Sequence, residues 1–211
     1  TFLDFVYTNM FSTLKTHRVR YGLMLREDGH VMDDGTTARL GDTHFVMTTT
    51  TAAAGAVMRH LEFVHQALRP DLNVRFTSVT EQWAQFAIAG PKSRYVLNGL
   101  LSKPLNDADW PFMACGAVTV AGVAGRLFRI SFSGEHAYEI AVPARYGASL
   151  FDVLVEAATE HGGGAYGMEA LNVLRIEKGH ITHAEIHGAV TAFDVGFARM
   201  VSAKKDCIGK T

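Results

Sequence analysis

Residues 20–36 read RYGLMLREDGHVMDDGT, in which two apolar stretches lie on either side of the polar turn 26–29. Short apolar stretches joined by a polar turn that contains Gly are typical of antiparallel strands in a hairpin. The same pattern extends over 17–51 and includes a further apolar stretch at 45–47. The sequence therefore predicts that this part of the chain forms an antiparallel sheet.

Two adjacent carboxylates, Asp33 and Asp34, lie where the second strand of this hairpin is expected to become buried. Successive strand residues point to opposite faces, so we expect one carboxylate to face the interior or a ligand, and the other to be solvated or to cap a turn. A partly buried carboxylate can accept a proton or favour a cationic amine. Taken alone, Asp-Asp-Gly is also typical of a plain turn, so both interpretations stay open here.

Helices and strands are segregated along the rest of the chain. The spacing of apolar residues predicts helices over 52–69, 91–101, 145–161 and 168–178 and strands over 83–88, 117–123, 126–133 and 138–142. A turn is expected at Ala124-Gly125, between two of the strands. Such segregation favours an α+β fold over a doubly wound parallel sheet.

The composition limits the function classes. Of the 211 residues, 48% are hydrophobic and 19% are charged, and the net charge of −1 gives no electrostatic footprint for nucleic acid or an anionic membrane. The two cysteines form no disulfide framework, and no apolar run approaches the roughly 18 residues that span a bilayer. We expect a cytoplasmic protein without nucleic-acid or membrane partners.

The domain organisation is predicted from weaker signals. The chain begins at Thr1 without an initiator Met and ends at Thr211 where no element has visibly finished, which suggests a fragment of a longer protein. We treat 1–211 as one region with a subdivision near 102–111, where a polar break separates predicted elements.

Two glycine-containing motifs mimic nucleotide-binding signatures. Residues 162–167 (GGGAYG) fit the dinucleotide spacing, but they follow a predicted helix instead of opening one, so a turn between helices is favoured. Residues 209–211 (GKT) resemble the end of a phosphate-binding loop, but that motif requires Gly at the position of Lys204. Neither motif predicts a nucleotide site.

Three histidines, His180, His183 and His187, are separated by gaps that would place them on one face of a helix. The flanking glycines Gly179 and Gly188 favour a loop instead, and no carboxylate or Cys pair accompanies them. The sequence therefore predicts no metal site.

Several segments, in the same order, resemble the folate-binding aminomethyltransferase family, whose namesake is the T-protein of the glycine cleavage system. These segments are 20–29, 32–35, 78–87 (SVTEQWAQFA), 133–140 (SGEHAYEI), 173–180 (VLRIEKGH) and 203–210 (AKKDCIGK). Within the family, they are most similar to the branch of sarcosine oxidase alpha subunits. The resemblance implies a T-protein-like α+β fold of antiparallel sheets and packed helices, without the family's C-terminal barrel domain.

The resemblance also implies roles for individual residues. Asp34 matches an Asp at the reactive end of tetrahydrofolate and is the catalytic candidate, whereas Tyr21 matches an aromatic that lines the folate cavity. Glu139 matches the carboxylate that hydrogen-bonds the pterin ring, whose edge of N–H donors suits a carboxylate acceptor. The remaining candidates are Phe132 for folate binding and, as secondary candidates, Asp33, Thr36 and Arg175.

Three positions depart from the methyltransferase pattern. Phe132 stands where these relatives commonly have Tyr, and Leu171 stands where they tend to carry an Arg that reaches the glutamate tail of folate. Gly35 replaces a large apolar residue of T-proteins. These departures favour the sarcosine oxidase branch.

That branch implies a specific reaction. Sarcosine would be oxidised on a flavin in another subunit, and the resulting imine would be captured on tetrahydrofolate to give 5,10-methylenetetrahydrofolate and glycine. The flavins and NAD would bind outside this chain, and its partners would be the beta, gamma and delta subunits. Two alternatives stay open: a stand-alone aminomethyltransferase that uses a lipoyl carrier protein, and a non-catalytic relative with the same fold.

Overall fold

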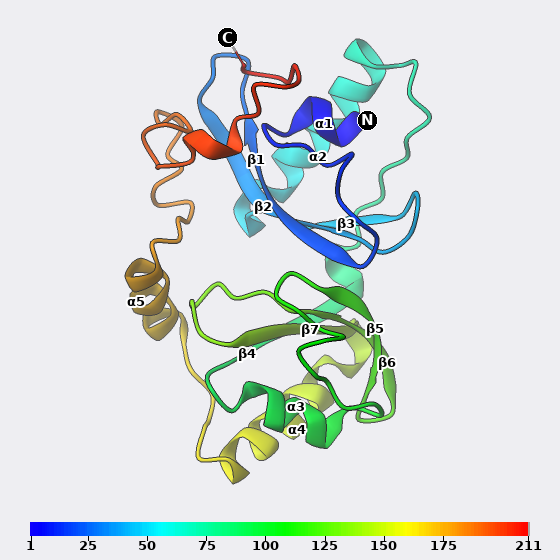
Figure 1. The fold of residues 1–211 in the computed structure, drawn as a ribbon, viewed down its shortest axis with the longest axis vertical. Coiled ribbons are helices and arrows are strands. Elements are labelled where there is room, and N and C mark those ends of the chain that lie inside the picture. The colour runs from blue at the N-terminus through cyan, green and yellow to red at the C-terminus, as the bar shows by residue number, and fades with distance from the viewer. Residues whose placement is uncertain (211) are drawn as a thin grey trace. The chain divides into compact units, whose positions relative to one another are not determined.

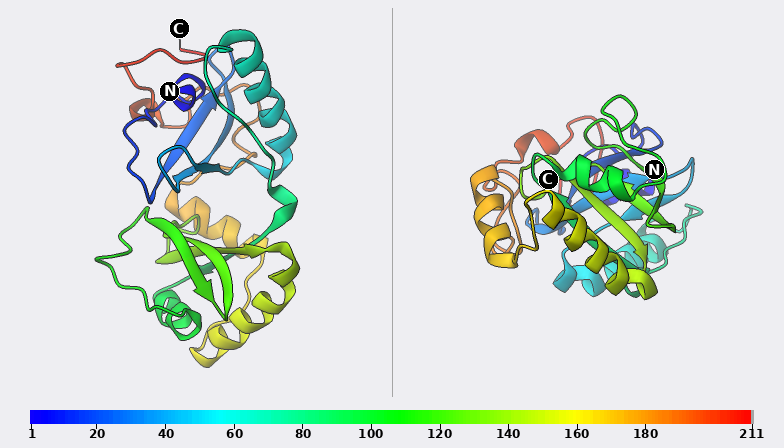
Figure 2. Two further views of the ribbon diagram at one scale, coloured as in Figure 1. Left: turned by 90° about the vertical axis from the view of Figure 1, so that its right-hand side faces the viewer. Right: turned by 90° about the horizontal axis from the view of Figure 1, so that it is seen from below.

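A computed structural model describes residues 1–210 (Figures 1 and 2). The contacts of the chain divide it into two compact units. Unit 1 consists of Thr1–Ser78 and the stretch from Ile181 onward, and unit 2 consists of Val79–His180. Residues 102–111, where the sequence suggested a subdivision, lie inside unit 2, in the connection between a helix and a strand.

Unit 1 contains the predicted antiparallel sheet, and that prediction is confirmed. Its strands are β1 (Arg18–Leu25), β2 (Val31–Arg39) and β3 (Phe45–Met47), arranged in the order β1-β2-β3. The register places Tyr21 opposite Thr36 and Leu23 opposite Asp34. Tyr21 and Asp34 are therefore diagonal neighbours on one face of the hairpin, a spacing that an aromatic side chain can bridge.

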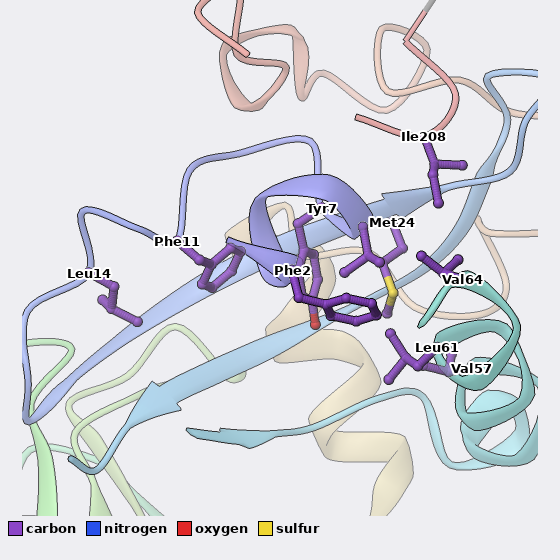
Figure 3. Packing of buried hydrophobic residues seen from close by; sticks show 10 residues of the cluster. Phe2, Tyr7, Phe11, Leu14, Met24, Val57, Leu61, Val64 and Ile208 are labelled. Atoms are coloured by element: carbon purple, nitrogen blue, oxygen red, sulfur yellow. The ribbon is translucent and has the colours of Figure 1, made fainter. Parts of the chain in front are cut away.

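Helices pack against this sheet. The predicted helix over 52–69 is present as η1 (Thr51–Ala53), α2 (Ala54–Phe63) and a closing π turn (Val64–Leu68). A short helix that the sequence pattern did not reveal, α1 (Phe2–Val6), is capped by Thr1 and Asp4. Figure 3 shows Phe2, Met24 and Leu61, from α1, β1 and α2, pointing toward one another in the core of unit 1.

Unit 2 is a four-stranded antiparallel sheet with helices. Its elements are β4 (Trp83–Ala89), α3 (Ser93–Leu100), β5 (Cys115–Val120), β6 (Val123–Phe128), β7 (Ala137–Pro143), α4 (Gly147–Glu160) and α5 (Met168–Lys178). The strand order is β4-β7-β6-β5. Helices α3 and α4 lie together on one side of the sheet (Figure 2), where Leu97 and Leu154 join Ile140 in the core.

The opposite face of this sheet carries the alternate residues of each strand. Ile140 pairs with Phe86 and is buried against the helices, so Glu139 and its partner Ala87 face the other way. By the same alternation, Gln85 lies on the face of Glu139. The sequence predicted the strands, but this grouping depends on the pairing of β4 with β7.

The turn predicted at Ala124-Gly125 is wrong. The turn lies at Ala121-Gly122, where φ is +45° and +78°, as a two-residue hairpin of the primed type requires. Gly125 lies within β6, and a Cβ at this position would come within 2.6 Å of the carbonyl oxygen of Ala141 on β7. Gly125 therefore allows close packing inside the sheet. At the turn, the first strand ends and the second begins three residues earlier in the sequence than predicted.

Within residues 1–210, no helix is both long enough and apolar enough to cross a membrane.

Candidate functional site

Tyr21 and Asp34 form a hydrogen-bonded pair across the hairpin of unit 1. The Tyr21 hydroxyl donates to Oδ2 of Asp34 over 2.6 Å. Phe197 packs edge-on against the Tyr21 ring, with 5.7 Å between the ring centroids. The structure thus brings two predicted site residues together, and it adds Phe197, which lies in a C-terminal loop and gave no signal in the sequence.

Burial sets the protonation behaviour of this pair. Burial raises the pKa of Asp34, and the hydrogen bond from Tyr21 opposes the rise by stabilising the carboxylate. Burial, together with the negative charge of Asp34, raises the pKa of Tyr21 above its usual value, so this phenol remains a donor. The pair therefore holds a carboxylate that takes up a proton more readily than an exposed Asp does.

Asp33 has a different environment from its neighbour. It is only 1% exposed, and Oδ2 accepts the backbone N–H of Thr50 over 3.2 Å. Thr50 directly precedes η1, so this hydrogen bond ties β2 to the segment in which the helix begins, and Asp33 is not solvated. Asp33 is therefore the carboxylate that faces the interior, and Asp34, on the opposite face of β2, is partly buried and hydrogen-bonded to Tyr21.

Thr36 is hydrogen-bonded to Thr48, in the segment that follows β3. Its backbone N–H donates to the hydroxyl oxygen of Thr48 over 2.9 Å, and the two hydroxyl oxygens lie 3.0 Å apart. Next to it, a Cβ on Gly35 would come within 2.1 Å of the Thr48 carbonyl oxygen. Gly35 is thus explained by close backbone packing beside the Asp pair.

A Gly35→Ala substitution is expected to destabilise the protein by about 1–3 kcal/mol, because the added methyl group overlaps the Thr48 backbone, which cannot rotate away. Gly99→Ala is the matched control, since nothing lies within 4 Å of a Cβ at Gly99 in α3. That control should be neutral or stabilising by about 0.5–1 kcal/mol. Urea unfolding measures both variants, and equal midpoints would contradict the packing account.

Tyr21→Phe is expected to raise the pKa of Asp34 by about one unit. Without the phenolic donor, the Asp34 carboxylate is less stabilised, and the ionised form is reached only at higher pH. NMR titration of the Asp34 carboxyl carbon measures the change, and Tyr95→Phe, at a side chain that is 64% exposed, is the control. An unchanged Asp34 pKa in the Tyr21 variant would show that the hydrogen bond does not tune Asp34.

Glu139 in unit 2 also contacts a diagonal neighbour on the adjacent strand, as Asp34 contacts Tyr21 in unit 1. Nε2 of Gln85, on the neighbouring strand β4, donates to Oε2 of Glu139. Burial raises the pKa of Glu139, and the Gln85 hydrogen bond opposes this rise. Tyr166 lies near enough for the charge of Glu139, in addition to burial, to raise its pKa. Sequence reasoning missed Gln85, because its proximity to Glu139 depends on the register of two strands that are distant in sequence.

Phe132, His180 and Arg175 form a second group in unit 2. Phe132 is 36% exposed, and its ring stacks on that of His180 at 5.8 Å between centroids. Nδ1 of His180 donates to the carbonyl oxygen of Phe132 over 2.9 Å. Arg175 is buried and donates to the His180 carbonyl oxygen over 3.2 Å. Arg175 and His180 therefore fasten the end of α5 to the loop that carries Phe132.

The other two histidines of the spaced motif, His183 and His187, lie in a loop, as predicted. Among residues 1–210, no three His, Cys, Asp or Glu side chains are grouped as metal ligands. A hollow of about 440 Å³ in unit 1 is lined by residues that include His60, Phe63 and Ile208, and no candidate site residue lines it. This hollow therefore does not coincide with the predicted site residues.

Comparison with known proteins places the chain in a family. Residues 1–205 match the GCVT N-terminal domain model, so the chain belongs to that family. It is 57% identical to the sarcosine oxidase subunit alpha of Rhizobium meliloti (strain 1021), over 99% of this chain and 22% of that protein. The chain thus spans about a fifth of the length of this relative.

Solved structures agree with the fold. The glycine cleavage system aminomethyltransferase T of Bartonella henselae superposes with a TM-score of 0.79 at 22% identity, covering 99% of this chain and 55% of that one. The heterotetrameric sarcosine oxidase of Corynebacterium sp. U-96, in complex with pyrrole 2-carboxylate, gives 0.53 at 14% identity, covering 72% and 69%. The predicted T-protein-like α+β fold is therefore confirmed.

Proposed function

We propose that this chain is the tetrahydrofolate-binding region of a sarcosine oxidase alpha subunit, and that it transfers the one-carbon unit from oxidised sarcosine to tetrahydrofolate. The observation that carries the proposal is the Tyr21–Asp34 pair, a partly buried carboxylate with a raised pKa that is held by a phenol. The 57% identity to a sarcosine oxidase alpha subunit supports the choice of reaction.

The residues of unit 2 suit a reduced pterin. Glu139 is half-buried, and Gln85 engages one of its oxygens, which leaves acceptor sites on the carboxylate for the N–H donors at a pterin edge. Phe132 offers an exposed aromatic face whose orientation is fixed by His180. Glu139 would therefore orient the ring, and Phe132 would provide a flat apolar contact.

When bound, tetrahydrofolate supplies the nucleophilic nitrogens that take up the methylene carbon of the imine, and glycine is released. Asp34 would stabilise the cationic imine and would move the proton that the amino nitrogen of glycine gains on leaving. Tyr21 would keep the Asp34 carboxylate in one orientation, and its own raised pKa keeps it a donor throughout. Asp33 would act indirectly, by fixing the segment that begins at Thr50.

The rest of the assembly would supply the oxidation. Flavin and NAD would bind outside this chain, and beta, gamma and delta subunits would complete a cytoplasmic enzyme. The sarcosine oxidase of Corynebacterium sp. U-96 is heterotetrameric, which agrees with such partners. Oxidation of sarcosine would thus occur elsewhere in the assembly, and this chain would receive the imine.

Product analysis tests the proposal. The full-length assembly is given sarcosine with and without tetrahydrofolate, and 5,10-methylenetetrahydrofolate and formaldehyde are measured. With tetrahydrofolate, formaldehyde should fall by the amount of methylene product formed, because water no longer intercepts the imine. A formaldehyde yield that is unchanged by tetrahydrofolate would reject the proposal. Activity that requires an aminomethyl-lipoyl carrier would instead support a stand-alone aminomethyltransferase.

A further inference from the structure

Phe197 contacts the Tyr21–Asp34 pair from a part of the chain that is far from the pair in sequence. Its ring meets the Tyr21 ring edge-on, with 5.7 Å between the centroids and 69° between the planes. Both residues belong to unit 1, and Phe197 directly precedes η5 (Ala198–Met200), in the orange segment near β1 in Figure 1. The Tyr21 side chain is thus held at its hydroxyl by Asp34 and at its ring by Phe197.

The loop 191–197, which carries Phe197, is fastened to the strand that carries Tyr21. Ala192 is 1% exposed and packs in one apolar cluster with Leu23 of β1. Leu23 lies two residues from Tyr21, on the same face of that strand. The N–H of Phe197 donates to the carbonyl oxygen of Ala192 over 2.7 Å, which closes the loop. The position of Phe197 is therefore fixed relative to Tyr21.

A single hydrogen bond does not hold a tyrosine side chain in one rotamer. Side chains exchange between staggered rotamers, and a phenol that is bound only at its hydroxyl leaves its partner when χ1 changes. An edge-on aromatic contact favours one orientation of the ring. Without Phe197, the Tyr21 hydroxyl would donate to Asp34 for a smaller fraction of the time.

We propose that Phe197 is a positioning residue, which holds the Tyr21 phenol in the rotamer that donates to Asp34. Its role in catalysis rests on the proposed function, in which Asp34 carries the proton of one-carbon transfer. Phe197 acts through Tyr21 and sets how readily the Asp34 carboxylate takes up a proton. The C-terminal part of the chain thus supplies a residue to a site that is otherwise formed by the hairpin.

The test is an NMR titration of the Asp34 carboxyl carbon in the full-length protein. Burial raises the pKa of Asp34, and the Tyr21 hydrogen bond lowers it. Phe197→Ala should raise this pKa by about half a unit, because the hydrogen bond forms less often. If Phe197 only shielded the site from water, its removal would lower the pKa, because the carboxylate would be better solvated. The sign of the change separates the two roles.

The charges around Asp34 stay the same in this variant, because Phe197 is uncharged. Among the described residues, Tyr7, Tyr21 and Asp33 have pKa values that the charge of Asp34 raises, and all three are retained. A change in the Asp34 pKa therefore reports on burial and on the Tyr21 hydrogen bond.

A double variant tests whether Phe197 acts through the Tyr21 hydroxyl. In a Tyr21→Phe background, Phe197→Ala should cause no further rise in the Asp34 pKa, because no phenolic donor is left to position. Phe197→Leu should restore most of the wild-type value, because Leu still fills the space beside the ring. Phe193→Ala is the matched control, since Phe193 lies in the same loop but is 68% exposed, and it should leave the pKa unchanged.

An unchanged or lowered Asp34 pKa in Phe197→Ala, or an equal further rise in the double variant, would overturn the inference. Thermal unfolding of each variant is measured alongside, and Phe197→Val, with the same expected sign, replaces Phe197→Ala if that variant does not fold. The titration uses no folate, so its result does not depend on the proposed function. A raised pKa in a protein whose wild type forms no 5,10-methylenetetrahydrofolate would confirm the positioning and reject the proposed function.

Discussion

Replacing Asp34 with Asn should slow one-carbon transfer to tetrahydrofolate by about 10²–10⁴-fold, because the amide has nearly the same shape but cannot accept the proton. Asn can still accept the hydrogen bond from Tyr21 through its carbonyl oxygen, so the local structure should persist. Folate affinity should therefore change little. Single-turnover formation of 5,10-methylenetetrahydrofolate measures the effect, and calorimetry measures the binding.

Asp28→Asn provides the control for this substitution. Asp28 belongs to the same hairpin, but it is exposed and paired with Arg26 at 2.5 Å, away from the Tyr21–Asp34 pair. Its variant should turn over at the wild-type rate. Full activity in Asp34→Asn would show that the site is a scaffold without proton-transfer chemistry, as in a non-catalytic relative of the family.

Replacing Glu139 with Gln should weaken the binding of 5-formyltetrahydrofolate about 100-fold, because hydrogen bonds to a partly buried carboxylate are replaced by weaker bonds to a neutral amide. The wild-type protein should also bind less tightly as the pH falls. Burial raises the pKa of Glu139, so protonation removes the carboxylate at a higher pH than for an exposed Glu. The Gln variant should lack this pH dependence.

Glu135→Gln is the matched control, since Glu135 lies in the same sequence segment but is exposed. Its affinity and its pH dependence should both match those of the wild type. If Glu139→Gln binds folate as tightly as the wild type at every pH, Glu139 is not the residue that contacts the pterin.

The sequence predicted the parts of the fold that depend on local patterns. The hairpin around Asp34 and the helices over 145–161 and 168–178 follow from apolar spacing, and the structure has α4 and α5 there. The turn was misplaced because Gly122 and Gly125 both permit a turn, and only the approach of β7 to Gly125 distinguishes them. Helix α1 was missed because five residues are too few to establish a period.

The candidate site was also predictable only in part, because some of its contacts depend on the order of the strands and not on local sequence. Tyr21 and Asp34 are joined by a short hairpin, so their proximity follows from local sequence once the strands are recognised. Gln85 meets Glu139 across 54 positions of sequence, so this contact requires the order of the strands. The burial of Asp33 likewise depends on the segment at Thr50.

Titration calorimetry of the wild-type full-length protein with 5-formyltetrahydrofolate, which does not accept a further one-carbon unit at its formylated nitrogen, tests the central claim most directly. We predict saturable binding with one folate per chain, which weakens as the pH is lowered through the raised pKa of Glu139. The absence of saturable heat at neutral pH would contradict the claim that this chain forms a tetrahydrofolate site.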